Sequence, residues 1–220
     1  MTAWQRLRGW LGGGPSGSDG ATDDTRWVVI DVESTGLDPR SDRLVAIAGV
    51  AVHVESGSAT VACGDSFEAV VQCDEAVFDR RNILVHGVGV GAWRRGVPLT
   101  QALQAFEAWA GMAPRIGFHV DFDRVLIQSA RRSAGLPAAP GRWIDLAPLA
   151  AAMHPDVRAR ALDEWLEHFG IECLARHEAV ADTLATAELW LYLWPALQRA
   201  GVRGSAAAQA LARDQRWLQR

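Results

Sequence analysis

Hydrophobic and polar positions follow two different patterns in the first and second halves of the folded chain. In the first half, apolar stretches rich in β-branched residues predict strands at residues 26–33, 43–54 and 59–71. The segment between the first two strands, "STGLDPRSD", has the Gly, Pro and Asp residues that are typical of a turn-rich loop. Because short connections join the three strands, we predict an antiparallel meander.

From about residue 99 the apolar positions recur at helical spacing, interrupted by two short apolar strands. The helix at 182–194 is apolar on almost every side, so we predict that it is buried. Gly170 is expected to end the preceding helix, because glycine readily adopts the left-handed conformation of a C-cap. The remaining predicted elements are helices at 99–111, 121–135, 161–170 and 205–220, a strand at 115–118, and a strand running into a helix at 142–153.

These elements predict an α/β fold in which helices flank a mixed sheet, with additional segments at both ends of the chain. Residues 1–25 combine a short amphipathic helix with a Gly/Ser-rich linker. Residues 26–200 form the predicted domain, and residues 201–220 form a C-terminal helix. The N-terminal helix could dock on its own domain, on a partner or on a membrane surface, and the sequence does not decide between them.

The apolar segments are too short to cross a membrane. The longest, "LATAELWLYLWPAL", contains Glu188 and Pro195 and falls short of the roughly 20 apolar residues that a span requires. At the N-terminus, no continuous apolar segment follows the arginines, so we predict no secretory signal. We therefore expect a cytoplasmic protein without a membrane span.

Charge and cysteine content narrow the candidate chemistry. The net charge of −4 argues against binding of nucleic acid through overall positive charge. Every basic residue is nevertheless arginine, which suits bidentate contacts to phosphate, although codon bias and solvated helix faces are the better explanation of any single arginine pair. Three scattered cysteines without a CxxC spacing argue against both a disulfide framework and a thiolate zinc site.

Four carboxylates occupy unexpected positions in this pattern. Asp31 and Glu33 lie two residues apart on the first strand, so their side chains share one face and repel each other. Asp123 and Asp182 lie near the starts of apolar helices, where a single acid could simply interact with the helix dipole. The four acids together call for a shared explanation.

A divalent cation explains all four acids, because Mg²⁺ and Mn²⁺ prefer carboxylate oxygens. Two such ions about 3.5–4 Å apart can hold the attacking and the leaving oxygen of a phosphoryl displacement. His177, five residues before Asp182, is the candidate base for the attacking water. Five helical residues rotate a side chain by about 140°, so we place His177 in the loop ahead of the helix. The alternative is a surface or capping histidine.

Three motifs resemble those of a known family. "DVESTG" resembles the first exonuclease motif, D-x-E-T-T-G, of DnaQ-like nucleases. "IGFHVDFDRVL" resembles the second, G-H-N-x-x-F-D, and "HEAVAD" the third, H-x-x-x-x-D. "VHGV" at 85–88 and "IDL" at 144–146 are weaker similarities to other family segments. A single D-x-E would be a weak signal, whereas three motifs in order and with the right internal spacing are specific.

The chain therefore resembles DEDDh-type 3′–5′ exonucleases, which include the proofreading subunit of bacterial replicative DNA polymerase, over about residues 26–195. The resemblance implies a ribonuclease-H-like fold, with a mixed five-stranded sheet whose first three strands are antiparallel and which helices flank. It implies two bound Mg²⁺ or Mn²⁺ ions and a general base at His177. The implied metal ligands are Asp31, Glu33, Asp123 and Asp182.

The resemblance also implies contacts between the terminal nucleotide and Ser34, Thr35 and Gly36. Ser34 departs from the family pattern by replacing the first of two threonines, but it retains a hydroxyl. Phe118 and His119 stand where His and Asn are usual. Phe118 could pack in the core or stack on a base, and it is a candidate substrate contact.

The function implied is removal of nucleoside 5′-monophosphates from a single-stranded 3′ end of DNA or RNA. The terminal segments could recruit a DNA polymerase or another protein. Two alternatives stay open. One is a catalytically weak module of the same fold that binds nucleic acid or accompanies a polymerase. The other is a metal phosphohydrolase that acts on a small phosphate ester or a nucleotide cofactor.

Overall fold

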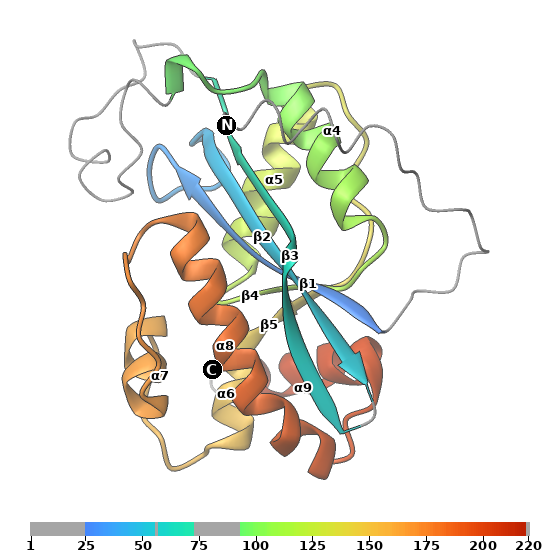
Figure 1. Cartoon of the computed structure of the whole chain (residues 1–220), viewed down its shortest axis with the longest axis vertical. Coiled ribbons are helices and arrows are strands. Elements are labelled where there is room, and N and C mark those ends of the chain that lie inside the picture. The colour runs from blue at the N-terminus through green and yellow to red at the C-terminus, as the bar shows by residue number, and fades with distance from the viewer. Residues whose placement is uncertain (1–24, 56, 73–92, 219–220) are drawn as a thin grey trace.

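Three long strands form the predicted antiparallel meander (Figure 1). They are β1 (Arg26–Ser34), β2 (Leu44–Glu55) and β3 (Ser58–Val70). The computed structural model describes residues 25–55, 57–72 and 93–218. The predicted N-terminal helix and the "VHGV" segment lie outside the described residues.

Two short strands complete a five-stranded sheet in the order β3-β2-β1-β4-β5. β4 (Arg115–Gly117) and β5 (Trp143–Asp145) run parallel to β1, which is the central strand. The predicted mixed sheet with three antiparallel strands first is therefore confirmed. Because β1 and β4 are parallel neighbours, their carboxyl ends meet at one edge of the sheet.

Helices cover both faces of the sheet (Figure 1). On β1, Trp27 and Val29 join the apolar cluster of α6 to α9, whereas Val28 and Ile30 join the cluster of α4 and α5. This alternation follows from the two-residue period of a strand. The helices are α4 (Leu99–Ala110), α5 (Asp121–Ser133), α6 (Leu146–Met153), α7 (Leu162–Phe169), α8 (Ala179–Arg199) and α9 (Gly204–Leu218).

Helix α8 is the long buried helix that the sequence predicts, but it is longer than expected. It begins at Ala179 and continues through Pro195 to Arg199, so the predicted end at residue 194 is wrong. A proline inside a helix costs about 3 kcal/mol because it lacks a donor and crowds the preceding turn. The fully buried side chains of Leu193 and Leu197 flank Pro195 and hold this part of α8 in the core.

Helices α7 and α9 show how a local sequence signal and tertiary packing each define an element. Gly170 follows α7 with a φ of 66°, so the predicted glycine C-cap is confirmed. Helix α9 packs against α6 and β5, and its Ala208 and Ala212 are buried in the same apolar cluster as α8. Within the described residues, no helix combines the length and apolarity needed to cross a membrane.

Candidate active site

The first two acids project from β1 toward the face that α8 covers. Asp31 and Glu33 continue the alternation of Trp27 and Val29, whose side chains pack in the α8 cluster. Both acids are partly buried, as expected for side chains between a sheet and a helix. The strand pattern therefore directs both carboxylates toward the first turn of α8, which carries Asp182.

The other two acids are contributed by helices that begin at the same edge of the sheet. Asp123 lies in the first turn of α5, only 5% exposed, and its carboxylate accepts a hydrogen bond from the N–H of Val32 on β1. Asp182 lies in the first turn of α8 and is 6% exposed. Segments far apart in the sequence thus bring carboxylates close to the carboxyl end of β1.

The electrostatics of the site show how strongly the acids influence one another. Burial, followed by repulsion from Asp182, raises the pKa of Asp31 to about 8. Burial and then the charges of Asp31 and Asp182 raise the pKa of Glu33 to about 9. The pKa of Asp123 is also raised well above its ordinary value, by burial and then by Asp31. The site therefore holds more negative charge than its surroundings neutralise.

One arginine partly compensates this charge. Arg176 forms ion pairs with Asp182 and with Asp163 on α7. The carboxylate of Asp182 also accepts hydrogen bonds from the backbone N–H of His177, at 3.1 Å, and from the thiol of Cys173, at 3.4 Å. Both carboxylate oxygens of Asp182 therefore have partners in the segment that precedes α8.

The site fits a divalent cation in its chemistry, but it is not a preformed cage. Carboxylate oxygens are the donors that Mg²⁺ and Mn²⁺ prefer, and burial followed by mutual repulsion raises the pKa values of Asp31 and Glu33, which a bound cation would lower again. Among the described residues, no three His, Cys, Asp or Glu side chains are arranged as a ready ligand set. The guanidinium group of Arg176, paired with Asp182, already places one positive charge at this cluster.

His177 lies in the turn ahead of α8, which is where the spacing to Asp182 predicts it. Its φ of 64° is unusual for a residue other than glycine, and its N–H bond to Asp182 supports this conformation. The side chain of His177 is exposed. The backbone of His177 is thus held by a candidate ligand while its ring faces solvent.

The predicted substrate contacts of the first motif lie in the loop after β1. Thr35 Oγ1 donates to Asp42 Oδ1 at 3.0 Å and accepts from the N–H of Arg43 at 2.9 Å. Ser34 donates to the carbonyl oxygen of Gly36. A Cβ atom on Gly36 would lie 2.6 Å from Asp42 Oδ2, so a larger residue there would displace the carboxylate that accepts from Thr35. Sequence reasoning missed Asp42, because it looks like any polar residue of a turn-rich loop.

The unusual pair of the second motif has structural partners. Phe118 is partly buried and packs against the α8 cluster, edge to face with the ring of His119. The N–H of His119 donates to Asp145 Oδ1 at 2.9 Å, and its Nε2 lies 3.0 Å from the carbonyl oxygen of Arg160. Asp145 also caps α6 by accepting from Ala147 N–H at 3.1 Å. An acid between a strand and an apolar helix is an N-cap signal that could have identified Asp145.

One protein-family profile matches most of the chain. The profile described as "Exonuclease", of the RNase T family, matches residues 28–190. These residues include all four acids and His177.

Curated relatives are much longer than this chain. The PolC-type DNA polymerase III of Staphylococcus saprophyticus is 26% identical over 176 residues, which cover 80% of this chain and 12% of that polymerase. The PolC-type DNA polymerase III of Listeria monocytogenes is 28% identical over 169 residues, covering 77% of this chain and 11% of that polymerase. The chain thus spans only a small part of these relatives.

Solved structures with a similar fold include two exonucleases bound to DNA. E. coli exonuclease I in complex with a dT13 oligonucleotide matches with a TM-score of 0.67 and 17% identity, over 80% of this chain and 42% of that chain. Exonuclease X in complex with 5′ overhanging duplex DNA matches with a TM-score of 0.63 and 17% identity, over 84% and 99% of the two chains. These likenesses confirm the predicted ribonuclease-H-like fold.

Proposed function

Because this chain belongs to the RNase T exonuclease family, we propose that it is a metal-dependent 3′–5′ exonuclease. The observation that carries the proposal is that acids from β1 and from the first turns of α5 and α8, at the three family motifs, meet at the carboxyl end of β1, close enough to raise one another's pKa values. An apolar core gains nothing from such a cluster, whereas a phosphodiesterase needs it to hold cations.

In this proposal two Mg²⁺ or Mn²⁺ ions are held by Asp31, Glu33, Asp123 and Asp182. When bound, the ions supply charge stabilisation for phosphoryl transfer. His177 accepts the proton of the attacking water, for which its exposed ring is accessible. Addition of water across the terminal P–O3′ bond releases a nucleoside 5′-monophosphate and leaves a new 3′-hydroxyl end.

The substrate is proposed to be a single-stranded 3′ end of DNA or RNA. Ser34, Thr35 and Gly36 would contact the terminal nucleotide, with Phe118 at its side. The likeness to exonuclease I bound to dT13 supports a single-stranded substrate. No residue of the chain identifies a contact to the 2′-hydroxyl, so DNA and RNA are both included.

The matches to PolC-type polymerases support association with a DNA polymerase in the cytoplasm. We place that contact in the terminal segments, residues 1–25 and 201–220. Because α9 packs against α6 and β5, its exposed side is the part of the C-terminal segment that a partner could reach.

The direct test uses a single-stranded oligonucleotide labelled at its 5′ end, with Mg²⁺ or Mn²⁺. Removal of nucleotides from the 3′ end gives a ladder of labelled products, whereas removal from the 5′ end releases the label as a mononucleotide. Asp123→Asn should lower the rate by orders of magnitude. Asp214→Asn is the matched control, because Asp214 is exposed on α9.

Other outcomes would favour the alternative functions. Binding of the oligonucleotide without shortening would indicate a nucleic-acid-binding module. Hydrolysis of a small phosphate ester without a ladder would indicate a phosphohydrolase. An Asp123→Asn variant that cleaves as fast as its parent would contradict the role proposed for the acids.

A further inference from the structure

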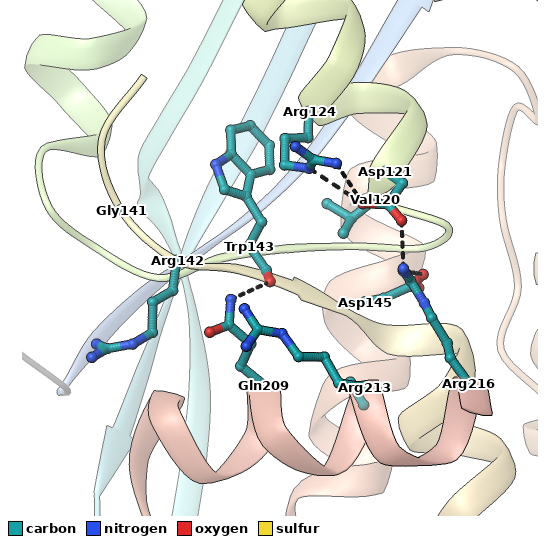
Figure 2. Close-up of a pocket in the computed structure, with 11 residues that line it drawn as sticks. Val120, Asp121, Arg124, Gly141, Arg142, Trp143, Asp145, Gln209, Arg213 and Arg216 are labelled. Carbon is teal, nitrogen blue, oxygen red and sulfur yellow. Dashed lines mark hydrogen bonds and ion pairs between the residues drawn. The ribbon is translucent and has the colours of Figure 1, made fainter. Parts of the chain in front are cut away.

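A pocket of about 590 Å³ lies between the start of α5, β5 and α9 (Figure 2). Four of its eleven lining residues are arginines, in a protein whose net charge is −4. Helix α9 contributes two of these side chains, and α5 and the segment before β5 contribute one each. The charged lining residues are Arg124, Arg142, Arg213, Arg216, Asp121 and Asp145.

The two acids of the pocket neutralise only part of this positive charge. Arg216 reaches from α9 to both Asp121 and Asp145, as Figure 2 shows. Arg124 pairs with Asp121 at 3.2 Å, so one carboxylate is shared between two guanidinium groups. Both acidic residues of the lining therefore already form ion pairs with arginines of the same pocket.

The other two arginines have no carboxylate partner among the described residues. Arg142 donates to Ser205 Oγ at 3.3 Å, which is a neutral contact. Arg213 is exposed and makes no hydrogen bond or ion pair with the described part of the chain. Both arginines line the same pocket and retain N–H donors without a carboxylate partner, and guanidinium donors suit phosphate oxygens.

The pocket and the acid cluster lie on opposite sides of one helical turn. Asp121 and Asp123 are both in the first turn of α5, and two residues rotate a side chain by about 200°. Asp123 is buried against β1, whereas Asp121 is exposed and lines the pocket. The pocket is thus about one helix width, ~10 Å, from the acids, a distance that about three stacked nucleotides at ~3.4 Å each span and a dinucleotide does not.

We propose that this pocket binds a backbone phosphate of the nucleic-acid strand whose 3′ end lies in the acid cluster. The identity of the strand rests on the proposed exonuclease function, whereas the preference for phosphate rests on Arg142 and Arg213. The pocket reads no base sequence, because guanidinium groups that contact phosphate position a strand without specifying it. The aromatic side chain of the lining, Trp143, already has the guanidinium of Arg115 on its ring, 5.3 Å from the centroid.

The test measures binding of the full chain in the Asp31→Asn background, so that cleavage does not interfere. A fluorescent single-stranded 12-mer, a dinucleotide and a nucleoside 5′-monophosphate are titrated with Mg²⁺ present. The double variant R142Q/R213Q is compared with R95Q/R132Q, which removes the same charge from exposed positions outside the pocket. R213Q alone is a second variant that changes only an exposed side chain, and thermal unfolding verifies that each protein is folded.

The proposal predicts about a tenfold weaker affinity of R142Q/R213Q for the 12-mer and unchanged affinity for the dinucleotide, which is too short to reach the pocket. The slope of log affinity against log salt should become shallower by about 0.7 for each phosphate that the variant no longer binds. R95Q/R132Q should bind all three ligands like its parent.

Two results would overturn the proposal. One is equal affinity of the pocket and control variants for the 12-mer. The other is a loss restricted to the 5′-monophosphate, which would assign the pocket to a free nucleotide. Because binding is measured without cleavage, the pocket can fail while the exonuclease function stands, and a normal pocket can be found in a chain that does not cleave.

Discussion

The guanidinium group of Arg176 lies against the carboxylate of Asp182, within the cluster of acids at the carboxyl end of β1. Arg176 also pairs with Asp163 of α7, so it joins α7 to the start of α8. The acid cluster therefore contains an internal cation where the proposed function requires divalent ions. A divalent ion that uses Asp182 as a ligand must compete with this guanidinium group.

We expect Arg176→Gln to bind Mn²⁺ more tightly than the parent, by about tenfold, because the competing cation is gone. Without metal, the same variant should be less stable by about 1–3 kcal/mol, the usual value of a partly buried charge-assisted bond. Isothermal titration measures the first effect, and urea unfolding in EDTA measures the second. Arg160→Gln is the control, since Arg160 is an exposed arginine just before α7. Equal Mn²⁺ affinity in all three proteins would contradict the competition.

The raised pKa values of Asp31 and Glu33, about 8 and about 9, predict the pH dependence of the metal-free protein. Between the ordinary values of 3.8 and 4.5 and these raised values, the folded state binds more protons than the unfolded state. The free energy of unfolding should therefore fall as the pH rises from 5 to 9.

Unfolding curves in EDTA at pH 5, 7 and 9 check this expectation, and the double variant D31N/E33Q should show a flatter profile and higher stability at pH 9. Added Mg²⁺ should restore stability to the parent at high pH but not to the double variant. A parent protein that becomes more stable across this range in EDTA would show that the two acids are not buried together.

Asp42 should act as a positioning residue for the loop after β1. Asp42→Ala removes the acceptor of Thr35 Oγ1 and of the Asp38 N–H, bonds of 3.0 and 2.8 Å. Because the loop is largely exposed, we expect a loss of stability of only about 1 kcal/mol. The KM for an oligonucleotide should rise several-fold, because Thr35 is no longer held. Asp42→Asn, which keeps one acceptor oxygen, should partly restore KM, and failure of this rescue would point to a different role.

His177→Ala should lower kcat by about 10²–10⁴, the usual contribution of a positioned general base. Since the side chain of His177 is exposed, added imidazole should reach the vacated space and restore part of the rate. The substitution leaves the backbone N–H that Asp182 accepts. Single-turnover rates with and without imidazole test this role. An undiminished rate in His177→Ala would exclude it.

Much of the fold could be predicted from local patterns. The strands β1 to β3 are long, β-branched and separated by turn residues, and α8 is apolar around most of its circumference. These apolar patterns are strong signals because each of them indicates which side of the strand or helix is buried. The run of α8 through Pro195 could not be predicted, since buried neighbours rather than local preference maintain the helix there.

The residues of the candidate site also fall into those that the sequence could identify and those that it could not. The four acids could be identified because a carboxylate among apolar residues is costly and demands a reason. Arg176 and Asp42 could not, because an arginine or an aspartate in a polar loop carries no local mark of its partner. Their roles arise only when α7 packs beside the start of α8, and when the loop after β1 closes on Thr35.

The most direct test of the account is a calorimetric titration of metal-free protein with Mn²⁺, in the parent and in the Asp123→Asn variant. The account predicts two bound ions in the parent and the loss of at least one of them in the variant, whose fold is unchanged by circular dichroism. A parent that binds no Mn²⁺, or a variant that binds both ions as tightly as the parent, would contradict it.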